Sequence, residues 1–203
     1  MEKRLHPGEA RTGTTHAPVV AARCATYEFG QVQAALRQVL APLGGMSAFV
    51  RPGERIALKP NLLFAGRPEQ AITTHPLVVA AVAVEVREAG ATPLVVESPG
   101  SGIVHVKPVI ERVYRKTGLR DAAERYGFEL SLDMTWETVS LSEGRVIRRL
   151  DVLSHILQAD GIINVGKLKT HTFMTFTGAT KNLFGVVPGL NKPGYHGKLR
   201  EPE

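Results

Sequence analysis

RIALKPNLLFAGRPEQAITTHPLVVAAVAVEVREAGATPLVVE (residues 55–97) is the stretch that decides the fold class. The β-rich run RIALKP (55–60) predicts a strand, and residues 76–89 are apolar and helical in character. Pro76 suits the first turn of that helix, and Gly90 suits its C-terminal stop. Residues 92–97 predict the next strand. The stretch therefore forms one βαβ unit, which is the building block of a parallel sheet.

The same alternation of short β-rich runs and helical segments continues on both sides of this unit. Upstream we expect a strand at 19–25 and a helix at 31–40, and downstream a helical segment at 109–126, weaker strands at 128–132 and 145–148, a helix at 151–158 and a strand at 161–166. We therefore predict an α/β fold, a largely parallel sheet with helices on both faces. We expect a loose leader at 1–16 and a single domain over 17–203.

The positive charge of the chain is concentrated near its C-terminus. The 203 residues include 25 Lys and Arg against 19 Asp and Glu, a formal charge of +6. Residues 161–200 contain six basic side chains and no acidic one, so the rest of the chain is formally neutral. Such a segment is typical of an anion site or of a solvated basic surface.

Hydropathy and cysteine content exclude several classes of protein. The longest apolar run, residues 77–84, is far shorter than the roughly 20 residues of a membrane span. The N-terminus has no secretory or twin-arginine pattern, so we expect a cytoplasmic chain. Cys24 is the only cysteine, which excludes an iron-sulfur cluster ligated within this chain; we expect Cys24 to be a buried structural thiol.

Polar residues follow three of the predicted strands and form the candidate site. In an open parallel sheet, ligands bind beyond the carboxyl ends of the strands, where neighbouring loops converge. We assign anion or cofactor binding to the amines, amides and hydroxyls of Lys59, Asn61, Ser98, Lys167, Lys169, Thr170 and Asn182. Glu97 and His171 are the candidate acid/base pair, and Lys181 is the candidate for electrostatic or covalent assistance. The alternative is that strand ends are polar because they meet solvent.

Familiar phosphate and metal patterns are not matched. Residues 161–167 have the spacing of a Walker A loop, but Leu168 stands where the motif needs Ser or Thr. No pair of histidines has a metal-binding spacing, so we predict no metal site. The competing possibility is a metal bound by His75, His171, His196 and Glu97.

The motifs together resemble a known family, the domain of unknown function 362 proteins. The stretches that carry the resemblance are KPNLL (59–63), THPLVVAAV (74–82), GATPLVVESPGSG (90–102) and NVGKLKTHTFMTFTGATKNLFGVVPGLNKPGYH (164–196). Family members are longer than this chain, so the resemblance implies a domain that is incomplete at its C-terminus, truncated after the basic, glycine-rich segment. Many members carry a ferredoxin-type module after this domain. The resemblance implies a link to an iron-sulfur protein through a C-terminal module or a partner. The segment GATKNLFGVVPG is also similar to the lactate racemase family, where Lys181 would stand at the position that carries the nickel-pincer cofactor; we take this as kinship of fold only.

We therefore expect an α/β domain that binds a small anionic ligand or an unidentified cofactor, as part of an iron-sulfur-linked redox or metabolic protein. The alternatives are a docking scaffold for a separate ferredoxin and a ligand site like that of lactate racemase. Nucleic-acid binding is the least favoured, because the phenylalanines of the basic segment have core-like spacing. Whether the domain is an enzyme stays open.

Overall fold

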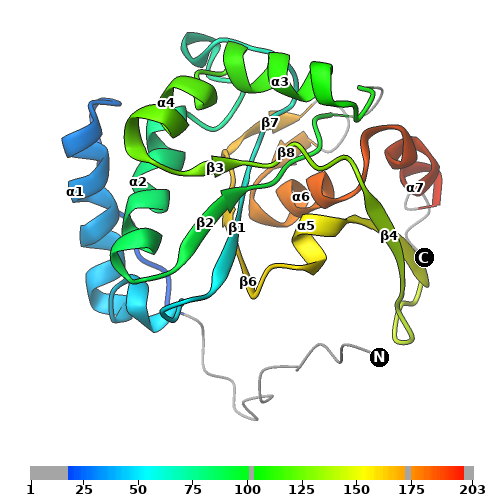
Figure 1. The fold of residues 1–203 in the computed structure, drawn as a ribbon, viewed down its shortest axis with the longest axis horizontal. Coiled ribbons are helices and arrows are strands. Elements are labelled where there is room, and N and C mark those ends of the chain that lie inside the picture. The colour runs from blue at the N-terminus through cyan, green and yellow to red at the C-terminus, as the bar shows by residue number, and fades with distance from the viewer. Residues whose placement is uncertain (1–17, 101–102, 172–174, 199–203) are drawn as a thin grey trace.

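A four-stranded parallel sheet lies at the centre of the protein (Figure 1). The computed structural model describes residues 18–100, 103–171 and 175–198. The strands are β1 (Arg55–Pro60), β2 (Thr92–Val95), β3 (Glu129–Leu130) and β6 (Gly161–Val165), in the order β3-β2-β1-β6. β1 pairs with β2 and with β6, and every one of its residues after Arg55 is buried. The predicted parallel sheet is confirmed.

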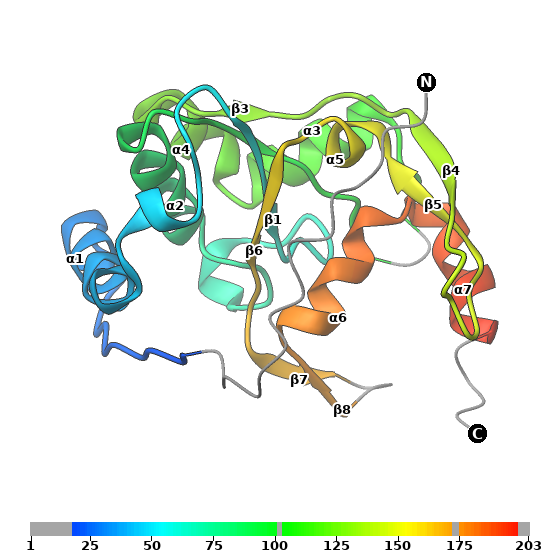
Figure 2. The ribbon, with the colours of Figure 1, turned by 90° about the horizontal axis from the view of Figure 1, so that it is seen from below.

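Helices cover both faces of this sheet, as expected. One face is covered by α2 (Pro76–Glu88), α3 (Lys107–Lys116) and α4 (Leu119–Tyr126), with α1 (Phe29–Leu40) packed on α2. The short helices α5 (Ser154–Leu157) and α6 (Ala179–Leu183) lie on the other side, and Figure 2 shows α2 and α6 on opposite sides of β1 and β6.

The side chains of the central strands alternate between two apolar cores. Ile56 and Leu58 belong to the core beneath α2, whereas Ala57 of the same strand belongs to the core beneath α5. This alternation is the two-residue period of a strand, and it explains why a strand covered on both faces has a continuous apolar sequence.

The order of the strands creates a switch point beside β1. The chain runs from β1 through α2 to β2, then through α3 and α4 to β3, and returns to pair β6 on the free side of β1. Thr74 joins the carboxyl ends of β1 and β6, because its Oγ1 accepts from the Asn61 amide and donates to the Val165 carbonyl, both at 2.8 Å. A switch point of this kind is where open α/β sheets form their ligand crevice.

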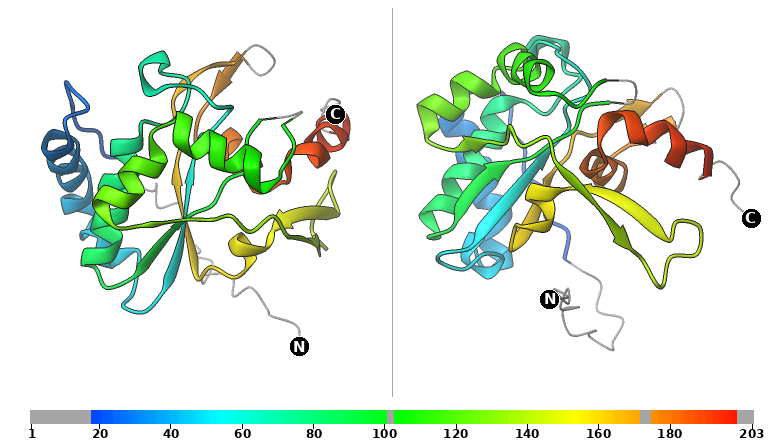
Figure 3. Two further views of the ribbon diagram at one scale, coloured as in Figure 1. Left: turned by 45° about the horizontal axis from the view of Figure 1, so that its top comes forward. Right: turned by 45° about the vertical axis from the view of Figure 1, so that its right-hand side comes forward.

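Two antiparallel strand pairs and several short helices complete the fold. The pair β4 (Trp136–Ser140) and β5 (Arg149–Leu153) projects from the sheet in both views of Figure 3. The pair β7 (Lys169–His171) and β8 (Thr175–Thr177) precedes α6. α7 (Lys192–Lys198) lies beside the first pair, and the Asp151 amide donates to the Tyr195 hydroxyl at 3.0 Å. The 3₁₀ helices are Ala41–Leu43, Met46–Ala48, Pro68–Gln70, Phe184–Val186 and Gly189–Asn191.

Some local expectations are wrong. Residues 19–25 form no strand: they precede α1 and pair with none of the strands that the structure describes. The strand expected at 145–148 is β5, which begins at Arg149, and it takes the first three residues of the helix expected at 151–158 because they pair with β4. Cys24 is exposed, so the prediction of a buried thiol is wrong. The expected leader at 1–16 lies outside the described residues.

Each helix in the described part of the chain is too short or too polar to span a lipid bilayer.

Candidate functional site

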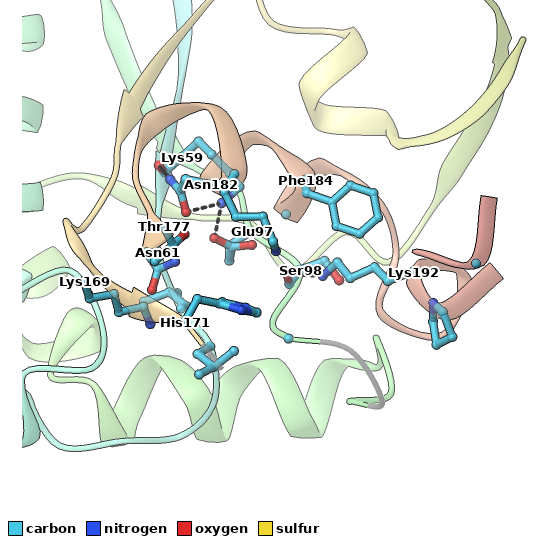
Figure 4. Close-up of a pocket in the computed structure, with 17 residues that line it drawn as sticks. Lys59, Asn61, Glu97, Ser98, Lys169, His171, Thr177, Asn182, Phe184 and Lys192 are labelled. Carbon is cyan, nitrogen blue, oxygen red and sulfur yellow. Dashed lines mark hydrogen bonds and ion pairs between the residues drawn. The ribbon is translucent and has the colours of Figure 1, made fainter. Parts of the chain in front are cut away.

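A cavity of about 570 Å³ opens at the carboxyl ends of β1 and β2 (Figure 4). Its polar walls come from the two strand ends, from β7 and β8, and from the short helices that follow them. Eight of the ten predicted site residues line it: Lys59, Asn61, Glu97, Ser98, Lys169, His171, Lys181 and Asn182. Distant segments are therefore brought together: Lys59 and Asn182, which form a hydrogen bond, are 123 residues apart in sequence.

A buried ion pair lies at the base of the cavity. Lys59 Nζ contacts Glu97 Oε2 in a short hydrogen bond, and the two residues are 1% and 4% exposed. Lys59 Nζ also donates to the Pro60 carbonyl at 2.7 Å. Burial lowers the pKa of Lys59 and raises the pKa of Glu97, because each charged form has lost its water; the opposite charge of the partner offsets part of both shifts.

Asn182 of α6 fixes the ion pair to the sheet. Its Oδ1 accepts from Lys59 Nζ at 3.3 Å, and its Nδ2 donates to the Lys59 carbonyl at 3.0 Å and to Asn164 Oδ1 at 2.7 Å. Asn164 in turn donates to the Ala179 carbonyl at 2.7 Å. The amide of Asn182 thus holds α6 against β1 and β6, and its role in the structure is to position Lys59.

Gly185 permits the backbone to approach the ion pair. A Cβ at this position would lie well under 3.0 Å from Glu97 Oε1 and from Lys59 Nζ, closer than real Cβ contacts come. The Gly185 carbonyl also accepts a hydrogen bond from the Ser98 amide at 3.0 Å. The glycine is therefore a steric requirement of the site rather than a turn residue.

Three basic side chains form the wall nearer to β7 and α6. Lys169 Nζ donates to the Ile72 carbonyl at 2.7 Å, and Lys181 Nζ lies 5.5 Å from the centroid of the Phe184 ring. Partial burial lowers the pKa of Lys169, His171 and Lys181, and the neighbouring lysines lower those of Lys169 and His171 further. Loss of water is the main cause of the three shifts, and repulsion between neighbouring cations adds to two of them; an anion bound beside these groups would oppose both effects.

Two predicted site residues do not line the cavity. Thr170 is exposed, because it stands between Lys169 and His171 on β7 and a strand sends alternate side chains to opposite faces. Lys167 lies in the loop before β7, where its charge acts on His75. The rule that ligands bind beyond the carboxyl ends of parallel strands (the strand-end rule) selects a loop. It does not tell which residues of that loop face the cavity, because this depends on the alternation of side chains along the strand.

Lys192 lines the cavity and was missing from the sequence-based site. It is 3% exposed, and its Nζ donates to the Ser98 carbonyl at 2.5 Å and in a shorter contact to the Pro99 carbonyl. Burial lowers its pKa to about 7. The charge count of the basic segment includes Lys192, but this residue follows no strand, so the strand-end rule could not select it.

Two polar atoms in the cavity wall have no hydrogen-bond partner among the described residues. These are Ser98 Oγ and Asn61 Oδ1, and both are buried. Ser98 as a whole is only 1% exposed. An unsatisfied buried hydroxyl or amide oxygen costs about 1–3 kcal/mol, and a ligand with hydrogen-bonding groups would remove that cost.

The described side chains offer no cluster of three or more His, Cys, Asp or Glu residues with the geometry of a metal site. His75, one member of the alternative metal site, caps α2 by accepting from the Leu77 amide at 3.2 Å and stacks on Tyr27 at 3.9 Å. The side chain of His196 lies outside the described residues. An iron-sulfur cluster does not fit this part of the chain, because several thiolates are needed and the sequence has one cysteine.

Comparison with known proteins places this chain in a family. The sequence profile of the domain of unknown function (DUF362) matches residues 56–201, and the chain belongs to that family. The thylakoid-associated protein sll1697 of Synechocystis sp. is 40% identical over 181 residues, which cover 86% of this chain and 52% of that protein. The chain thus spans about half the length of this relative. No solved structure matches.

Proposed function

We propose that this DUF362 chain binds a small anionic ligand in the cavity at the carboxyl ends of β1 and β2. The single observation that supports this is the charge of the walls: among the described lining residues, four lysines and one histidine surround one carboxylate, Glu97. Glu97 is already paired with Lys59. The remaining lysines therefore have no lining carboxylate left to neutralise them.

The excess of positive charge in the cavity wall favours the binding of an anion. A buried cation costs several kcal/mol unless an opposite charge accompanies it, and burial accordingly lowers the pKa of Lys169, Lys181 and Lys192. A carboxylate or phosphate in the cavity would supply the missing charge. Its oxygen atoms would face Lys169, His171 and Lys181, while a neutral part of the ligand would meet Ser98 and Asn61.

In a reaction at this site, Glu97 and His171 remain the proposed acid/base pair. Both line the cavity, and burial raises the pKa of Glu97 against the lowering effect of Lys59, while burial lowers the pKa of His171. Lys181 is the proposed electrostatic group. Membership in a larger iron-sulfur-linked protein, docking of a separate ferredoxin, and a cytoplasmic location stay predictions of the sequence. The name of the Synechocystis relative associates that protein with thylakoids, which leaves the cytoplasmic expectation unconfirmed.

Thermal unfolding with inorganic phosphate and with malonate, at matched ionic strength, tests the anion site. At 100 times its Kd, a ligand stabilises the folded state by about 2.7 kcal/mol, or roughly 5–10 °C in Tm for a chain of this length. Lys181→Ala should abolish the shift because it removes a wall cation. Lys116→Ala, an exposed lysine of α3, should leave it intact. Equal shifts in both variants, or no shift with any anion, would contradict the proposal.

A further inference from the structure

We infer that Lys192 is a nucleophilic amine that forms an imine with a carbonyl compound carrying a carboxylate or phosphate, such as a 2-oxo acid. This inference rests on the proposed anion site and names the class of ligand for it. The carbonyl carbon would lie at Lys192, and the anionic group would lie toward the wall of Lys169, His171 and Lys181.

The first argument is the surroundings of Lys192 Nζ. The side chain runs from the start of α7 toward Ser98, and its Nζ donates to the carbonyl oxygens of Ser98 and Pro99 (Figure 4). Among the described residues, no carboxylate oxygen lies within ion-pair distance of this nitrogen. A neutral amine has two N–H bonds and one lone pair. Two carbonyl acceptors satisfy both N–H bonds and leave the lone pair available for attack.

The second argument is the charge balance of the buried site. Lys59 and Lys192 are 1% and 3% exposed, Lys181 is half-buried, and Glu97 is the one carboxylate among the described lining residues. Because Lys59 takes Glu97 as its partner, Lys192 is left as a buried amine for which the described residues provide no ion-pair partner. In a medium of low dielectric such an amine gives up its proton, which is how buried lysines become nucleophiles.

The titratable groups that face Lys192 also favour its neutral form. Burial is the main cause that lowers the pKa of Lys192 to about 7; Glu97 opposes the shift, and the charges of Lys59 and Lys181 contribute to it. His105 also lies near, and burial together with Lys192 lowers the pKa of its ring, which therefore stays neutral. A substantial fraction of Lys192 is thus uncharged at neutral pH, whereas an ordinary lysine with a pKa near 10.5 is almost fully protonated.

The step balances without an oxidant or reductant. The lone pair of Nζ forms a bond to the carbonyl carbon while the π electrons move to oxygen, and a proton passes from nitrogen to that oxygen. The C–O bond of this carbinolamine then breaks as the oxygen takes a second proton and leaves as water. The nitrogen loses its last proton to give a C=N bond. The proton that the leaving oxygen takes is matched by the one that the nitrogen releases, so water can carry it from one to the other.

Borohydride trapping tests the inference on the wild-type chain. Borohydride reduces an imine to a stable secondary amine, so pyruvate plus borohydride should leave one adduct per chain, mapped by peptide mass spectrometry to Lys192. The rate should rise as the pH passes through about 7. Acetaldehyde, which has no anionic group, should react far more slowly at Lys192. Adducts spread over exposed lysines, or an unmodified Lys192, would overturn the inference.

Two variants provide matched controls. Lys192→Arg keeps a long cation that can donate to both carbonyls but cannot form an imine, so the adduct should disappear. Lys116→Arg, on the exposed side of α3, should give the same yield as the wild type. If Lys192→Arg retains the full yield, the inference is wrong. The location of the adduct in the wild-type protein, found by peptide mass spectrometry, tests the inference even if a variant folds poorly.

Thermal unfolding with anions and trapping with pyruvate, both on the wild-type protein, distinguish this inference from the proposed function. Phosphate and malonate have no carbonyl that reacts with an amine in this way. Thermal stabilisation by these anions without a pyruvate adduct would overturn the role of Lys192 and leave the anion site standing. If the anions do not stabilise the protein and pyruvate leaves no specific adduct, both the anion site and the role of Lys192 are wrong.

Discussion

Removing the charge of Glu97 while keeping its shape should be among the most costly single substitutions in this protein. In Glu97→Gln the amide oxygen can still accept from Lys59, so the change isolates the charge. Lys59, 1% exposed, would then be a buried cation without a counter-ion or would have to release its proton. Breaking a buried pair in this way costs about 3–5 kcal/mol.

The cost of deprotonating Lys59 gives a second estimate of this loss, of the same magnitude. Releasing the proton of an amine whose ordinary pKa is 10.5 costs about 5 kcal/mol at pH 7, at roughly 1.4 kcal/mol for each pH unit. This sets the ceiling for the loss, because Lys59 takes whichever state is cheaper. For a chain of this length, 3–5 kcal/mol corresponds to a fall in Tm of about 6–20 °C.

The pH dependence of the loss identifies its cause. Between pH 7 and 9 the wild-type pair holds one proton in the folded state and the same number unfolded, so its contribution is flat. In Glu97→Gln a neutral Lys59 binds fewer protons folded than unfolded, so stability rises with pH. The deficit of the variant should therefore shrink as the pH rises, by at most about 1.4 kcal/mol per unit.

Urea unfolding at pH 7, 8 and 9 measures these effects. The control is Glu88→Gln, which removes an ion pair with Arg37 whose side chains are about half exposed and should cost under about 1 kcal/mol. The double variant Lys59→Met/Glu97→Gln should cost much less than its two single changes together, because neither charge is left alone. A loss below about 1 kcal/mol in Glu97→Gln, or additive single losses, would refute the reasoning.

Two further predictions concern the backbone around the cavity. Gly185→Ala should destabilise the fold by about 1–3 kcal/mol and weaken phosphate binding, because its methyl group would collide with the buried ion pair; Gly194→Ala, with open space at its Cβ, should be close to neutral in urea unfolding. Thr74→Val should cost about 1–3 kcal/mol, since it leaves the Asn61 amide after β1 and the Val165 carbonyl of β6 without the hydroxyl that bridges them. Thr92→Val, at an exposed position of β2, is the control, and equal losses in the two variants would argue against the bridge.

Local pattern was sufficient for the central elements. β1 has the predicted bounds, 55–60, and α2 ends one residue before its predicted end, because a buried strand and a helix with Pro76 at its start leave strong local signals. Residues 19–25 show the limit of such signals. They have the composition of a strand, but a strand exists only where a neighbour supplies hydrogen bonds, and none of the described strands pairs with them.

The candidate site also has features that the sequence predicts and features that only packing decides. The sequence by itself determined that parallel strands end in polar residues and that the positive charge is collected after β6, which is enough to gather Lys59, Glu97 and Lys181 at one cavity. Only the tertiary structure decided which of these charges are paired. Lys59 pairs with Glu97, Lys192 is buried against two neutral carbonyls, and Thr170 faces away from the cavity. The physical reason is that charge and residue type are written in the sequence, whereas loss of water and choice of partner arise when distant segments pack.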